Sequence, residues 1–147
     1  LELRGRYSLA GLSDALASLQ LQGAFAWAEG EDSQGVPVDT VDPMTLVLGL
    51  QWQPLSWPVS TELAWTWSDA KAPEDIATDR IATDSFDVLD LMVHYDINET
   101  LTLDAGLFNL FDATYIRWAD TAGIGEDAAE RFTQPGRNFA VTLRASL

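Results

Sequence analysis

The sequence predicts an all-β fold, the wall of an antiparallel transmembrane β-barrel with about seven strands. Three observations carry this prediction. Apolar and polar residues alternate through these segments, and most segments have roughly the 9–11 residues with which a tilted strand crosses a bilayer. Short turns and long loops follow one another between the segments. Tryptophans gather near both ends of the segments, as they do at the two interfaces of a membrane barrel.

Each expected strand has one apolar face and one polar or small face. In chain order the strands are expected at 1–9, 18–29, 44–53, 59–69, 85–95, 101–108 and 138–147. Their apolar faces include, in the same order, Leu3, Phe25, Leu48, Leu63, Leu91, Leu107 and Val141. Their other faces include Arg4, Gln22, Gly49, Glu62, Asp90, Asp104 and Arg144. A helical interpretation fails, because a period of 3.6 residues would scatter each apolar set around the axis.

The connections between these strands fall into two classes of length. The short ones are expected at 9–17, 54–58 and 96–100. The long ones, rich in Asp, Glu, Gly and Pro, are expected at 30–43, 70–84 and 111–136. Outer-membrane barrels have short periplasmic turns and long extracellular loops. If the short turns are periplasmic, the first strand runs towards the periplasm and the last strand ends there.

Aromatic residues mark both ends of the expected strands. The predicted membrane-interface aromatics are Trp27, Trp65 and Trp67 at the long-loop end, and Trp52, Trp57 and Tyr95 at the short-turn end. Two such belts around an aliphatic band match the two interfaces of a bilayer. A soluble β-sandwich is the alternative, because sandwiches also alternate and carry Trp in their cores.

The composition excludes several classes of function. The formal charge of −15 at pH 7 argues against nucleic acid as a partner, since clustered Lys and Arg supply most of that affinity. Cysteine is absent and His94 is the single histidine, so no thiolate zinc site is possible and no Ser–His–Asp order is visible. No catalytic residue and no metal site are predicted, and the protein is not expected to be an enzyme.

The odd number of expected strands bears on the domain organisation. Single-chain bacterial barrels have even strand numbers, and an open sheet edge cannot face lipid. Residues 1–147 are therefore expected to be the C-terminal part of a larger barrel. A free-standing structural barrel of eight strands is the alternative, with one strand unrecognised or lying upstream of Leu1.

Motifs in the last third of the chain carry a family resemblance. Ala-Gly-Leu-Phe-Asn-Leu-Phe-Asp spans 105–112, Tyr115 and Arg-Trp-Ala-Asp at 117–120 follow, and Arg-Phe-Thr-Gln-Pro-Gly-Arg-Asn spans 131–138. With these motifs the chain resembles the C-terminal part of TonB-dependent outer-membrane receptors, most closely the haem and haemoglobin receptor branch. A looser match at 35–43 precedes the third expected strand.

The resemblance implies a barrel of about 22 strands around a plug, with the plug domain and the N-terminal strands outside these residues. It also implies TonB-dependent uptake across the bacterial outer membrane, with haem or a haem protein as the transported ligand. The expected partners are outer-membrane lipid, the plug domain, the N-terminal strands, TonB and the ligand. No cofactor is expected to be bound by this segment. A receptor for a siderophore or another nutrient is the alternative.

The segment after the sixth strand supplies the candidate ligand-binding residues. Tyr115, Arg117 and Trp118 are expected on the long-loop side, where an extracellular ligand arrives. Trp stacks on flat apolar ligands and Arg pairs with carboxylates, which are the two features that haem offers. The alternative is an interface aromatic together with a loop-stabilising ion pair to Asp120.

Other charged groups have plainer interpretations. His94 is expected near a short turn, as a structural or solvated residue of the polar face rather than a ligand of haem or metal. Charged residues of the polar faces, such as Asp104 and Arg144, are expected to form cross-strand ion pairs in a polar lumen. The acidic clusters of the long loops, which include Asp79, could bind calcium. Solvated, mutually repelling loops are the simpler interpretation.

Overall fold

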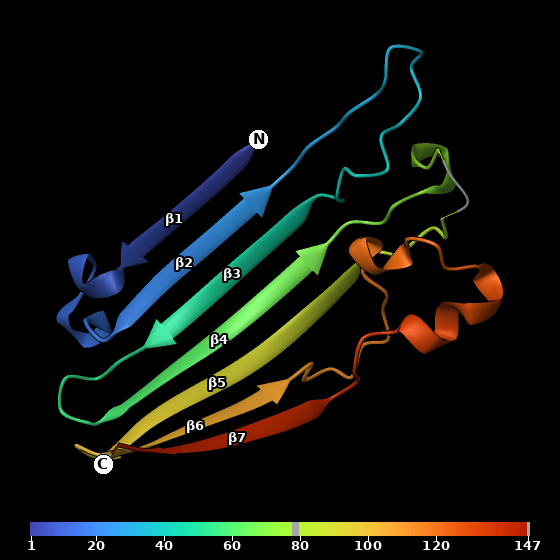
Figure 1. Cartoon of the computed structure of the whole chain (residues 1–147). Coiled ribbons are helices and arrows are strands. Elements are labelled where there is room, and N and C mark those ends of the chain that lie inside the picture. The colour runs from blue at the N-terminus through green and yellow to red at the C-terminus, as the bar shows by residue number, and fades with distance from the viewer. Residues whose placement is uncertain (78–79, 147) are drawn as a thin grey trace.

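Seven strands form one antiparallel sheet in the computed structural model, which describes residues 1–77 and 80–146. Each strand is hydrogen-bonded to the next one along the chain (Figure 1). They are β1 (Glu2–Ser8), β2 (Leu19–Ala26), β3 (Thr45–Trp52), β4 (Val59–Ser68), β5 (Phe86–Asn98), β6 (Leu101–Phe108) and β7 (Asn138–Ala145). The all-β, antiparallel prediction is confirmed. Asp79 in the second acidic cluster and Leu147 in the last expected strand lie outside the described residues.

The two classes of connection lie at opposite ends of the sheet (Figure 1). The first short turn contains two 3₁₀ helices, η1 (Leu9–Gly11) and η2 (Asp14–Leu16). The long connections are called here loop 1 (27–44), loop 2 (69–85) and loop 3 (109–137). They carry the 3₁₀ helices η3 (Pro73–Asp75), η4 (Trp118–Thr121) and η5 (Glu126–Phe132). None of the helices in the described residues is long and apolar enough to cross a membrane.

Residues of like character face one another across the strand pairs. Leu50 of β3 lies opposite Leu21 of β2 and Leu63 of β4. Leu91 of β5 lies opposite Leu63 and also opposite Leu107 of β6. Side chains of directly paired residues lie on the same face of a sheet, so these leucines belong to one continuous apolar face. The register therefore confirms the alternation that the sequence predicts.

Nothing in the described part of the chain covers this apolar face. Leu48 in the middle of the sheet is 47% exposed, and Phe139 on β7 is 76% exposed. A β-sandwich would bury such side chains between two sheets about 10 Å apart. The described strands instead form a single, unclosed sheet with β1 and β7 as its edges. The sandwich alternative is therefore wrong, and the apolar face is suited to contact with lipid.

The opposite face of the sheet is polar. Gln22 of β2 donates a hydrogen bond across β3 to the Glu62 carboxylate of β4. This crossing passes over Gly49, where an added Cβ would lie 2.6 Å from Cγ of Gln22. At the β7 edge of the sheet, the Arg144 guanidinium lies 3.2 Å from the Asp104 carboxylate. A cross-strand ion pair of the kind expected for a polar lumen is thus present between β6 and β7.

The end of β2 differs from the expected one. The strand ends at Ala26 rather than near residue 29, although the Trp27 N–H still donates to the Leu1 carbonyl oxygen at 2.9 Å. Beyond this point loop 1 pairs with itself, through a bridge between Glu31 and Pro37. Residues 30–38 thus lie outside the sheet and pair within their own loop.

The boundary between β5 and β6 also differs. β5 continues to Asn98 rather than ending at Tyr95, so that Glu99 and Thr100 alone form the turn. The register shifts between Asp96 and Asn98, which is the signature of a β-bulge. The alternation itself continues through Ile97. The last residues of the strand are hidden because Asp96 and Asn98 are residue types typical of turns.

Candidate functional site

Two residues with left-handed backbone fasten the start of loop 3 to its end. Asn109 (φ 52°) and Asp112 (φ 58°) occupy this region, which Asn and Asp tolerate better than most residues with side chains. The Asn109 amide group donates to the carbonyl oxygens of Ala113 at 2.8 Å and Pro135 at 3.2 Å. The Asp112 carboxylate accepts the Arg137 N–H at 2.7 Å. Asn109 and Asp112, the loop 3 clasp, thus hold both ends of the loop beside β6 and β7.

Trp118 lies among the three long loops. It begins η4 in loop 3 and is only 4% exposed. Its indole N–H donates to the Asp39 carbonyl oxygen of loop 1 at 2.9 Å. The Lys71 ammonium of loop 2 lies 5.4 Å from the centroid of the Trp118 ring and donates to the Val41 carbonyl oxygen of loop 1 at 3.3 Å. A ring from loop 3 is therefore in contact with both other loops.

Arg80 in loop 2 binds the Trp118 ring and the backbone around it. The guanidinium carbon lies 3.8 Å from the ring centroid, within the range of a cation–π contact. Nη1 donates to the Asp39 carbonyl oxygen at 2.9 Å, and Nη2 donates to the Trp118 carbonyl oxygen. Nε donates to the hydroxyl of Thr121 at 3.0 Å, and Thr121 is completely buried. We refer to Asp39, Lys71, Arg80, Trp118 and Thr121 as the loop core.

Arg80 and Thr121 are functional candidates that sequence reasoning missed. The partners of Arg80 lie 38 to 41 residues away along the chain, and no periodic pattern connects them. The available signal was charge, because Arg80 and Lys71 are the only basic residues in the otherwise acidic sequence of loop 2. A basic residue within an acidic segment indicates that a contact exists, but the sequence does not show which residue is its partner.

Three candidate ligand-binding residues lie around one cavity of about 310 Å³ at the loop end of the sheet. The Tyr115 ring stacks on Phe86 of β5, with centroids 4.1 Å apart. Arg117 is exposed, whereas Trp118 lines the cavity from within the loop core. The cavity is at the small end of the range for ligand pockets, about 300–1,000 Å³. It could therefore accommodate one edge of a large ligand, and the binding role of these residues stays a prediction.

Among the described side chains, Arg117 and Asp120 do not form the ion pair of the alternative interpretation. The Asp120 carboxylate instead accepts a hydrogen bond from the Gln134 amide group at 2.9 Å. The Gln134 N–H in turn donates to the Tyr115 carbonyl oxygen at 2.8 Å. These bonds join the first half of loop 3 to its second half and leave the Arg117 guanidinium at the surface.

The six predicted interface aromatics lie at the two ends of the sheet. At the short-turn end, Trp52 and Trp57 meet edge to face with ring centroids 6.2 Å apart, and Tyr95 is 40% exposed. At the long-loop end are Trp27, Trp65 and Trp67. Amphipathic rings at these heights are suited to the headgroup regions of a bilayer, and their contact with lipid stays a prediction.

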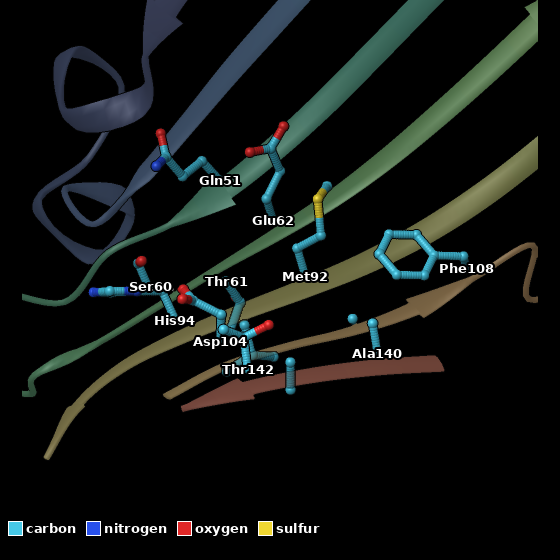
Figure 2. A pocket seen from close by; sticks show the side chains of 13 residues that line it. Gln51, Ser60, Thr61, Glu62, Met92, His94, Asp104, Phe108, Ala140 and Thr142 are labelled. Atoms are coloured by element: carbon cyan, nitrogen blue, oxygen red, sulfur yellow. Dashed lines mark hydrogen bonds and ion pairs between the residues drawn. The ribbon is translucent and has the colours of Figure 1, made fainter. Parts of the chain in front are cut away.

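A second cavity, of about 340 Å³, lies on the polar face. Figure 2 shows side chains from β3 to β7 lining it, with His94 and Asp104 close together. His94 Nδ1 lies 2.7 Å from the Asp104 carboxylate, and Nε2 lies 3.1 Å from the Asp96 carboxylate. With both ring nitrogens engaged, His94 has the geometry of a structural residue. No group of three or more His, Cys, Asp or Glu in the described ranges could hold a metal ion.

Comparison with known proteins shows what kind of barrel this sheet belongs to. Residues 1–110 match the family described as TonB dependent receptor-like, beta-barrel. The chain belongs to this family. TonB-dependent receptors are proteins of the outer membrane of Gram-negative bacteria, so the predicted location and the predicted family are confirmed.

Curated relatives of this TonB-dependent receptor chain are named for binding other proteins. The chain is 23% identical over 167 residues to a hemoglobin-haptoglobin-binding protein A of Haemophilus influenzae, which covers 97% of the chain and 16% of that protein. It is 24% identical over 124 residues to a lactoferrin-binding protein A of Neisseria meningitidis, which covers 72% of the chain and 13% of that protein. The chain therefore spans only a small part of the length of these relatives.

Solved receptor structures share the fold of the described sheet. The copper transporter OprC superposes with a TM-score of 0.78 at 25% identity, over 99% of the chain and 22% of its own. A mutant of the ferric enterobactin receptor PfeA from Pseudomonas aeruginosa superposes with a TM-score of 0.67 at 26% identity, over 99% and 22%. The agreement over nearly all residues confirms the predicted fold class, a segment of a TonB-dependent receptor barrel.

Proposed function

We propose that the chain is the C-terminal barrel wall of a receptor that takes up haem, or iron from a haem protein, across the outer membrane. One observation carries this proposal. Two relatives that match 97% and 98% of the chain are named for binding hemoglobin-haptoglobin and hemoglobin. Such a receptor performs transport rather than a chemical reaction, so the proposal includes no enzymatic step.

In the proposed mechanism, the loop end, the polar face and the apolar face of the sheet have different roles. The ligand binds at loops 1 to 3, TonB acts on the plug domain of the whole receptor, and the ligand then passes to the periplasm. The polar face lines the lumen beside the plug domain and the N-terminal strands. The apolar face contacts lipid. Haem is the cargo in this scheme, and the segment needs no cofactor of its own.

Within loop 3, the proposal assigns ligand contact to Tyr115 and Arg117. The exposed Arg117 guanidinium is suited to a carboxylate such as a haem propionate, because its planar donors match two oxygens. Trp118 is enclosed by the loop core and only 4% exposed. Its contribution to binding is therefore support of the loops rather than stacking on the ligand.

A receptor for a ferric siderophore or another nutrient is the second candidate. It is supported by the similarity in fold to the copper transporter OprC and to the ferric enterobactin receptor. This candidate uses the same loops, lumen and energy supply, and differs only in the ligand that the loops select.

Growth on defined iron sources tests the proposed function. Cells that depend on the full-length receptor for iron are given haem, haemoglobin or a ferric siderophore as the sole source. The proposal expects growth on haem or haemoglobin, and loss of that growth when TonB is deleted. Growth on the siderophore alone would instead establish the second candidate.

A further inference from the structure

The three long loops need an internal tie, because their charge drives them apart. They contain most of the Asp and Glu residues of a chain whose formal charge is −15. Like charges in neighbouring loops repel, and they do so more strongly where the loops exclude water. Each loop is nevertheless packed against the others around Trp118, which is 4% exposed. Some specific interaction must therefore offset the repulsion.

The two basic residues of loop 2 lie where that interaction is required. Lys71 is 9% exposed and lies beside the Trp118 ring. Arg80 lies on the same ring at 3.8 Å and donates to acceptors in both other loops: the Asp39 carbonyl oxygen in loop 1, and the Trp118 carbonyl oxygen and Thr121 hydroxyl in loop 3. A single guanidinium thus joins all three loops.

We propose that Arg80 is a positioning residue for ligand capture, because it holds loops 1, 2 and 3 together as one preformed surface. This inference rests on the proposed function in one respect only, that the loops are where the ligand binds. Arg80 does not touch the ligand in this account. It raises the fraction of receptors whose loops are arranged for binding, and apparent affinity scales with that fraction.

Arginine is suited to this position in a way that lysine is not. The planar guanidinium can lie flat on an aromatic ring while its N–H groups donate to several acceptors around its own edge. A lysine ammonium can retain the charge on the ring but cannot reach Asp39, Trp118 and Thr121 in the same geometry. Arg80→Lys should therefore restore part of the function that Arg80→Ala loses.

The test uses the full-length receptor in outer membranes, with Arg80→Ala, Arg80→Lys and a matched control. Arg131→Ala is the control, because it removes the same charge from an exposed residue of loop 3. Heat-modifiable migration in gel electrophoresis first verifies that each variant barrel is assembled. If Arg80→Ala does not assemble, the same measurements are made on Arg80→Lys. The readouts are hydrogen exchange at 39–41 and 118–121 without ligand, the Kd for haemoglobin, and the maximal rate of uptake.

We expect Arg80→Ala to speed exchange in both segments and to weaken haemoglobin binding about tenfold, corresponding to about a tenfold smaller competent fraction. The maximal rate of uptake at saturating haemoglobin should stay at the wild-type value. In exchange rate and in Kd, Arg80→Lys should be intermediate and Arg131→Ala unchanged.

Exchange in Arg80→Ala equal to that in Arg131→Ala would overturn the proposal, as would a lower maximal rate with unchanged Kd. A wild-type receptor that does not bind haemoglobin would overturn the proposed function instead, while the exchange data, which need no ligand, still decide the role of Arg80.

Discussion

At the residue scale, the path of loop 3 depends on a few polar contacts at its ends and one ring in its middle. Asn109 is 3% exposed and makes its hydrogen bonds to both ends of the loop. Its own N–H donates to the Asp90 carboxylate of β5 at 2.8 Å. Trp118 fixes the centre of the loop against loops 1 and 2. Between these points the Gln134 amide group donates to the Asp120 carboxylate, and the Tyr115 ring stacks on Phe86.

Replacing Asn109 should therefore be costly. We expect Asn109→Ala to lower the free energy of unfolding of the full-length receptor by about 2–4 kcal/mol, from lost hydrogen bonds and from alanine in a left-handed conformation. Asn138→Ala is the control, because the exposed Asn138 amide group donates to the nearby Gly136 carbonyl oxygen, and it should cost less than about 1 kcal/mol. Urea denaturation measures both, and equal losses would contradict the role of the clasp.

The tip of loop 1 should respond to acid. The Asp32 carboxylate accepts the N–H groups of Val36 at 3.0 Å and Gln34 at 2.8 Å, and these bonds hold the pKa of Asp32 below its usual range. A lowered folded-state pKa stabilises the folded tip at pH values above the unfolded-state pKa of about 3.9, and this contribution is lost as the pH falls through the folded value.

We therefore expect the Gln34 and Val36 amides to be protected from hydrogen exchange above about pH 4 and to lose protection, relative to intrinsic rates, below it. Asp32→Asn keeps an acceptor oxygen but removes the titration, so its protection should not change with pH. Protection of the wild-type amides that is constant down to about pH 2 would contradict the role of the carboxylate.

Residue roles in the loops could be predicted from the sequence only in part. The segment of Tyr115, Arg117 and Trp118 was identified from residue type, and the structure places the three around one cavity. The burial of Trp118 could not be predicted, because it depends on Arg80 and Asp39 in other loops. Contacts between irregular segments have no period, and sequence patterns therefore do not reveal them.

At the element scale, strands and faces were predictable because one rule governs both. Alternation fixes which residues of a strand share a face. Antiparallel pairing then places residues of the same face opposite one another on neighbouring strands, as it does for Leu50 and Leu63. The rule does not fix where a strand ends, since Asp96 and Asn98 belong to β5 although both residue types are typical of turns. It also says nothing of close packing on one face, such as the Gln22 side chain above Gly49. Alternation alone predicts tolerance of Gly49→Ser, whereas the structure requires Gln22 to move.

The same substitution on the two faces tests their assignment. We expect Leu48→Arg, at mid-sheet on the apolar face, to destabilise the inserted barrel by about 2–4 kcal/mol. Gln22→Arg, near the same height on the polar face, should be tolerated, because the new guanidinium can bind the Glu62 carboxylate that Gln22 now contacts. The measurement is the yield of heat-modifiable full-length receptor in the outer membrane. Equal yields for the two variants would contradict the assignment.

At the scale of the whole molecule, the sheet is asymmetric in two directions. Across its thickness it has an uncovered apolar face and a polar face, and along its length it has short turns at one end and three packed loops at the other. Together these asymmetries fix how the sheet must lie in a membrane. Because the chain belongs to the TonB-dependent receptor family, this membrane is the outer membrane of a Gram-negative bacterium.

The orientation in that membrane is the central claim, and cysteine labelling tests it most directly. Single cysteines replace Gln34 at the tip of loop 1 and Leu55 in a short turn, both exposed in the structure, in a full-length receptor otherwise free of cysteine. Intact cells are treated with a bulky maleimide that does not cross the outer membrane. We expect labelling at position 34 in intact cells, and at position 55 only after the outer membrane is permeabilised. Labelling at position 55 in intact cells, with position 34 protected, would contradict the account.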